Sequence, residues 1–106
     1  MKIKTNNTVI DITDAETVTL DENVVFIQRG NCCDTLNINE AESIVSFRER
    51  HNDWEYEVVE HIIGLVADDF FSILENEYKQ EKTINYEETI AELLHFYLPE
   101  ESRVWN

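Results

Sequence analysis

The chain has little glycine or proline, and this shortage limits what kind of protein it can be. Its 106 residues include only 2 Gly and 1 Pro, which argues against a loop-rich chain and against a glycine-rich phosphate-binding loop. A disordered acidic chain is also excluded, because 42% of the residues are apolar and 10% are aromatic. We therefore expect a single folded domain over residues 1–106, a common size for a domain.

Long hydrophobic runs are absent as well. No apolar stretch approaches the ~18 residues that a membrane-spanning helix needs, and no basic N-terminal segment precedes a shorter apolar one. These two absences predict a cytoplasmic protein with neither a secretory leader nor a membrane span.

Cysteine is limited to the adjacent pair Cys32 and Cys33. Their Cα atoms are only ~3.8 Å apart across a trans peptide, which is below the usual disulfide span. We expect two reduced thiols near a turn, one pointing inward and the other outward.

The most informative shortage is that of basic residues. The chain has 23 acidic and 8 basic residues, a formal net charge of -15. No Lys or Arg lies between His51 and Tyr78, a segment that holds eight acids. Phosphate binding needs clustered Lys and Arg. The composition therefore argues against direct nucleic-acid binding and favours a basic partner.

Residues 1–38 have the alternating pattern of β-strands. Apolar residues alternate on both sides of Asn6–Asn7, which predicts a hairpin with the positive φ angles of a type I′ turn. Val24–Arg29 is a continuous apolar run typical of a central strand, and 18–20 and Thr35–Ile38 predict short strands beside it. The pattern indicates a small, mostly antiparallel sheet of three to five strands.

Residues 39–98 have the pattern of about three helices packed on that sheet, which makes the expected fold α+β. The last helix should end at Leu98, because Pro99 disfavours helical geometry in the residue before it. Residues 99–106 form a tail, in which Val104 and Trp105 can dock back on the domain. Side chains at three positions are predicted to cap the helices: Asn39, Asp53 and Asn85.

The longest predicted helix covers residues 54–79, as one helix or as two collinear ones. Its apolar side chains share a wide face, and Asp69 near the edge of that face is expected to be partly buried. Gly64 predicts either a break or the close approach of another backbone. Phe71 points toward the polar side, where it is either covered by the third helix or exposed.

The opposite side of this helix is acidic. Four carboxylates fall together there, and no cation before Lys79 lies one turn away to offset them. They extend over roughly 27 Å, far sparser than the one charge per ~1.7 Å of duplex DNA, so acids on neighbouring surface would have to contribute to any mimicry. The four are Glu57, Glu60, Asp68 and Glu75.

No catalytic, cofactor-binding or metal-binding arrangement is recognisable. No Ser lies in a nucleophile-elbow context. Glu92 and His95 match the Glu-x-x-His of di-iron bundles, but such a site needs two of these motifs and two further Glu. The three histidines fit no metal-site spacing. We therefore predict a protein that is not an enzyme.

The first functional hypothesis is an inhibitor that occupies the basic, nucleic-acid-binding surface of another protein. Anti-restriction, anti-CRISPR and repair-inhibitor proteins of phages and mobile elements are similar in size and acidity, although no motif places the chain in one such family. Carboxylates would steer association, and large aromatic side chains would anchor it. The predicted partner-binding residues are Trp54, Glu55, Tyr56, Glu57, Glu60, Asp68, Asp69, Phe71, Glu75 and Glu77, and Trp105 is a further candidate anchor.

Two alternative functions are equally compatible with this composition. One is an immunity or antitoxin-type protein that neutralises a cognate basic toxin. The other is an acidic adaptor or subunit whose charge serves solubility. Reversing the acids of the long helix should weaken binding under either inhibitor hypothesis and leave an adaptor unaffected. A homodimer that presents two acidic faces is compatible with all three.

Overall fold

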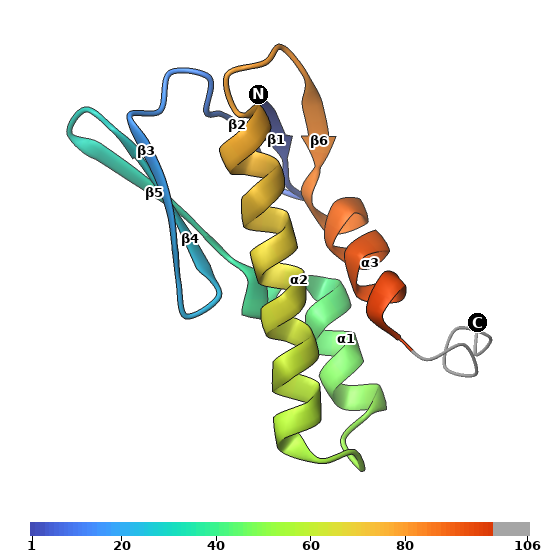
Figure 1. Cartoon of the computed structure of the whole chain (residues 1–106). Coiled ribbons are helices and arrows are strands. Elements are labelled where there is room, and N and C mark those ends of the chain that lie inside the picture. The colour runs from blue at the N-terminus through green and yellow to red at the C-terminus, as the bar shows by residue number, and fades with distance from the viewer. Residues whose placement is uncertain (99–106) are drawn as a thin grey trace.

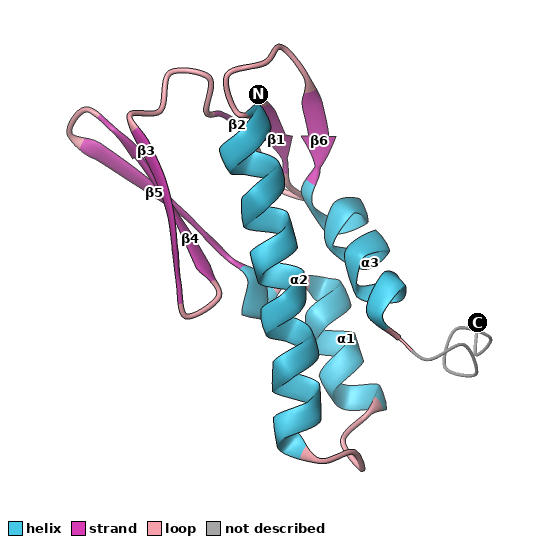
Figure 2. Cartoon of the chain, viewed as in Figure 1, coloured by secondary structure: helices cyan, strands magenta, loops and turns pink. Residues whose placement is uncertain are grey.

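The structure, a computed structural model, describes residues 1–98. Its strands form two small sheets rather than the one predicted (Figures 1 and 2). The first sheet has the order β2-β1-β6, and the second has the order β3-β4-β5. The strands are β1 (Lys2–Lys4), β2 (Val9–Asp11), β3 (Thr17–Asp21), β4 (Val24–Arg29), β5 (Cys32–Asn37) and β6 (Thr83–Asn85).

The first sheet brings together segments that are far apart in the sequence. β1 pairs antiparallel with β2 and parallel with β6, so that Ile3 lies between Ile10 and Ile84. The order of strands before helices is therefore wrong for β6, which lies between two helices in the sequence. A strand of three residues has too little alternation to be recognised, and its partner is about 80 residues away.

The second sheet is antiparallel throughout, and β4 is its central strand, as predicted. Val25 and Ile27 are fully buried on one face of β4. Both cysteines lie in β5 and are exposed. The prediction of one inward and one outward thiol is therefore wrong.

Four helical segments complete the fold, which is α+β as predicted. They are η1 (Ile38–Glu40), α1 (Glu42–Arg50), α2 (Tyr56–Glu77) and α3 (Tyr86–Tyr97). α2 is one continuous helix that packs against both α3 and β3. Figure 1 shows it between the β3-β4-β5 sheet and α3, with the α1–α2 connection at the opposite end from the β2-β1-β6 sheet. The helix α3 ends at Tyr97 with Leu98 as its C-cap, as Pro99 predicts.

One buried cluster draws side chains from both sheets and from all the helical segments. Ile3, Ile27, Phe47 and Phe70 are among its fully buried members. The ring of Tyr86 meets Phe70 edge-on at 5.4 Å between centroids. The core therefore holds the helices in fixed positions, which in turn fixes the outward face of α2.

Only one of the three predicted caps is present. The Asn85 side chain accepts a hydrogen bond from the Glu88 backbone N–H (3.0 Å), which caps α3. α1 and α2 begin after Ala41 and Glu55, and neither cap residue makes a side-chain cap bond. The free N–H of Glu42 is bound by the carboxylate of Glu87 (3.0 Å). A partner from α3 thus replaces the local cap expected at Asn39.

Two local predictions about the backbone are also wrong. Positive φ angles occur at Glu22 and Asn23 in the β3–β4 turn, and not at Asn6–Asn7. Gly64 neither breaks α2 nor admits another backbone, because nothing lies within 4 Å of a Cβ placed on it. The β1–β2 hairpin itself is as predicted. The expected docking of Val104 and Trp105 lies outside the described residues.

Candidate functional site

The outward face of α2 carries a line of acids. Glu57, Asp68 and Glu75 are exposed. None of the three makes a hydrogen bond or ion pair through its side chain to the described part of the chain. A rise of ~1.5 Å per residue separates the first from the last by roughly 27 Å. We call these three residues the α2 acidic line.

Glu60 was predicted to belong to this line, but it lies on the side of α2 that faces α1. Its carboxylate receives two hydrogen bonds from Arg48, from Nη2 at 2.8 Å and from Nε at 3.0 Å. The hydrogen bond to Glu60 raises the pKa of Arg48 above its usual value. The pair is internally neutral, and Glu60 contributes little to the acidic surface.

Two further predicted acids are held by other elements. Asp69 is half-buried, as expected, and accepts a hydrogen bond from the Tyr97 hydroxyl of α3. That hydrogen bond raises the pKa of Tyr97. Glu77 accepts a hydrogen bond from Lys82 at 3.1 Å. Of the predicted acids, the α2 acidic line and Glu55 are therefore the ones that are exposed and make no side-chain hydrogen bond or ion pair within residues 1–98.

The three predicted aromatic anchors among residues 1–98 differ in exposure, and the fourth candidate, Trp105, lies outside the described residues. Tyr56 is 77% exposed, the highest value among the large apolar side chains of residues 1–98. Trp54 is half-buried, and its ring stacks on His51 with 4.0 Å between centroids. Phe71 is half-buried. Tyr56 is thus the anchor whose surface is open to a partner.

Sequence reasoning missed a small hollow where α1 ends and α2 begins. Its volume is about 250 Å³, and Arg48, Trp54, Tyr56 and Glu60 are among its lining residues. His51 also lines it and is only 9% exposed, and its Nε2 has no hydrogen-bond partner among the described residues. Three aromatic rings within six residues, at positions 51, 54 and 56, were the available signal.

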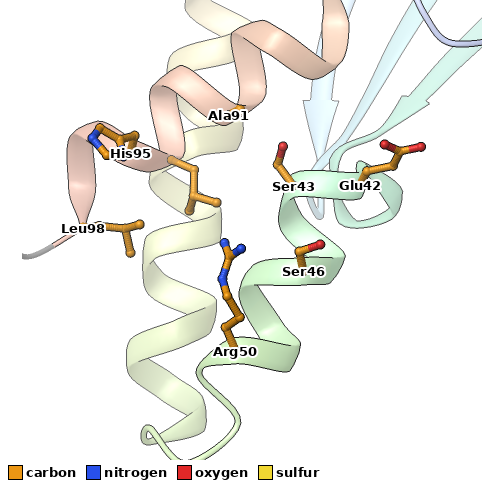
Figure 3. Close-up of a pocket in the computed structure, with 8 residues that line it drawn as sticks. Glu42, Ser43, Ser46, Arg50, Ala91, His95 and Leu98 are labelled. Atoms are coloured by element: carbon orange, nitrogen blue, oxygen red, sulfur yellow. The ribbon is translucent and has the colours of Figure 1, made fainter. Parts of the chain in front are cut away.

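A second hollow lies between α1 and α3 and has a volume of about 350 Å³ (Figure 3). Ser43 and Ser46 line it from α1, and Arg50 extends into the space between the helices. His95 of α3 points away from both serines. No hydrogen bond among residues 1–98 connects either serine to a histidine. The arrangement lacks the hydroxyl–base contact of a nucleophilic site.

The described residues contain no group of three or more His, Cys, Asp or Glu placed to hold a metal ion. Within the same range, every helix is too short or too polar to cross a bilayer. Comparisons of the chain with protein families, with curated proteins and with solved structures find no match.

Proposed function

We propose that the protein is a non-enzymatic inhibitor that binds the basic, nucleic-acid-binding surface of another protein. The observation that carries the proposal is the α2 acidic line, in which Glu57, Asp68 and Glu75 are exposed and form no ion pair with any cation of residues 1–98. A protein whose acidity served only solubility needs no such alignment, because scattered charge does the same.

The electrostatics suit fast association with a groove lined by Lys and Arg. With a net charge of -15, the protein attracts a basic surface over distances of the order of the Debye length, ~8 Å at physiological ionic strength. Such steering raises association rates and makes them sensitive to salt. Occupation of the groove would exclude nucleic acid by competition, and no chemical step is needed.

Charge alone does not give a tight complex, because exposed ion pairs are worth only about 0–1 kcal/mol each. Interfaces take most of their affinity from a few aromatic or Arg anchors that lose contact with water. Tyr56 is the first residue of α2, and Glu57 begins the acidic line directly after it. The proposed surface therefore combines an aromatic anchor with the carboxylates that would guide a partner to it.

The first test is capture of a partner from nuclease-treated bacterial lysate on the immobilised chain, followed by competition with duplex DNA. We expect a basic nucleic-acid-binding protein that DNA displaces, and whose DNA binding the chain inhibits in purified form. The triple variant Glu57→Gln, Asp68→Asn, Glu75→Gln should slow association with that protein by roughly tenfold or more at low salt.

The matched control removes the same amount of charge elsewhere. Asp14, Asp21 and Glu22 are exposed and lie outside the helices, and their neutralisation to amides should slow association much less. If the two triple variants slowed association equally, the acidic line would contribute only through the protein's net charge. A partner that DNA does not displace would instead favour the immunity or adaptor alternatives.

A further inference from the structure

The hollow at the α1–α2 corner has the size of a side-chain pocket. Its volume of about 250 Å³ is below the ~300–1,000 Å³ of sites that take drug-sized ligands. Its lining residues belong to α1, α2 and the connection between them, and Figure 1 shows this connection at the end of the molecule away from the β2-β1-β6 sheet. The hollow is also next to the start of the acidic line, because Tyr56 borders it and Glu57 follows in the chain.

One wall is a stacked aromatic platform. His51 and Trp54 are 4.0 Å apart with an interplanar angle of 22°. Phe47 supports both rings edge-on, at 4.9 Å from His51 and 6.2 Å from Trp54. Phe47 is fully buried, so the platform is fixed by the core. A pre-positioned flat surface of this kind suits a planar group that can stack on it.

The charge around the hollow favours a cation. Arg48 lines it, but the two hydrogen bonds to Glu60 offset its charge, and its Nη2 also donates to the Asn39 Oδ1 (3.0 Å). Residues 51–60 contain four acids and no Lys or Arg. Asp53, Glu55 and Glu57 are exposed. An incoming cation would therefore meet a hollow lined by aromatic residues, with exposed carboxylates beside it, and such surroundings favour cation–π contacts.

His51 adds an unsatisfied polar atom. The residue is 9% exposed, and its Nε2 and the Nε of Arg29 are the buried side-chain polar atoms without a partner among residues 1–98. Burial, with a smaller contribution from Arg50, lowers the pKa of His51 below its usual value. Because this nitrogen is closed to solvent, His51 offers a ligand the surface of its ring and not its Nε2.

We propose that this hollow receives an arginine side chain of the basic partner, stacked on the aromatic rings and surrounded by the acids that flank it. The inference rests on the proposed function, and it assigns the contact that the acidic line alone does not specify. The partner's arginine stacks on Tyr56 and the His51–Trp54 platform, while the rest of its basic surface faces Glu57, Asp68 and Glu75.

The test uses a single side chain so that bulk charge contributes little. The ¹⁵N-labelled chain is titrated at low salt with N-acetyl, C-amidated Gly-Arg-Gly, with the lysine tripeptide, and with the neutral citrulline tripeptide. We expect saturable shifts of the Trp54 indole N–H and of the residue 51–56 amides with the arginine peptide. Lysine should bind more weakly, because it cannot stack, and citrulline should give no saturation.

Tyr56→Ala should weaken arginine binding by roughly two- to fivefold, the range expected for loss of an exposed cation–π contact. The control is Phe96→Ala, which removes a ring of similar exposure, 72%, from α3 and should leave binding unchanged. The proposal that the hollow binds arginine would be refuted by chemical-shift changes confined to the acidic line. It would also be refuted if both variants bound arginine as tightly as the wild type. Either result would leave the proposed function standing, because the triple variant and DNA competition test it separately.

Discussion

Burial lowers the pKa of His51, and the protein's stability should depend on pH through this residue. Burial and Arg50 lower the pKa of His51, and Asp53 opposes them to a smaller extent. The folded pKa lies below the unfolded value of ~6.5. The unfolded chain therefore binds more protons as the pH falls below that value. His51 supports folding fully above pH 6.5, and this contribution is lost as the pH falls toward the folded pKa.

We predict that the urea midpoint falls between pH 7 and pH 5, and that His51→Phe makes this fall shallower. Phe keeps an aromatic ring beside Phe47 and Trp54 and removes the buried nitrogen that has no partner. The control His61→Asn changes an exposed histidine on α2 and should retain the wild-type pH dependence. The same slope in His51→Phe and wild type would show that other groups cause the fall.

Single residues also show where sequence reasoning stops. The helical spacing correctly placed Glu57, Asp68 and Glu75 on one exposed face, because position on a helix is a local property. It could not show that Glu60 pairs with Arg48, or that Tyr97 donates to Asp69. Those partners come from other elements, and only the packing of α1 and α3 against α2 brings them within reach.

At the scale of elements, Gly64 makes helix α2 less stable than an alanine at the same position would. The residue lies inside a continuous helix, and a Cβ placed on it meets nothing within 4 Å. Gly in a helix interior is less favourable than Ala by about 0.8–1.0 kcal/mol. We predict that Gly64→Ala raises the free energy of unfolding by about 0.5–1 kcal/mol, measured by urea denaturation.

The other glycine provides a control of opposite sign. Gly30 has a φ of +55° in the turn between β4 and β5, where an L side chain costs roughly 1–2 kcal/mol. Gly30→Ala should therefore destabilise the protein, although its Cβ also meets nothing within 4 Å. If Gly64→Ala were destabilising as well, the helix would need its glycine for a reason other than space.

Elements with strong local patterns were predicted correctly, and those defined by distant partners were not. The period of the apolar residues indicated α2, and the Asn85–Glu88 pair correctly marked the start of α3. The strand β6 escaped notice, because a three-residue segment becomes a strand only through its pairing with β1. For the same reason the sequence could not show that the strands divide into two sheets.

At the scale of the whole molecule, net charge opposes folding. A formal charge of -15 on 106 residues repels itself most strongly at low ionic strength, where the Debye length is ~30 Å at 0.01 M against ~8 Å at 0.15 M. We predict that the melting temperature rises as salt increases between these values, measured by circular dichroism. Neutralising Glu57, Asp68 and Glu75 should reduce the slope. A melting temperature indifferent to salt would show that the charges are well spread or paired.

The pairing of β1 with β6 can form only after the chain between these strands has been synthesised. Residues 2–4 emerge from the ribosome before their parallel partner, residues 83–85, which emerges only after α1 and α2 have been made. The β1–β2 hairpin can form early, because its strands are neighbours in the chain. The edge of β1 that later receives β6 is then open to wrong partners until residues 83–85 have been made. A nascent chain stalled before residue 83 should therefore be the form of this protein most prone to aggregate.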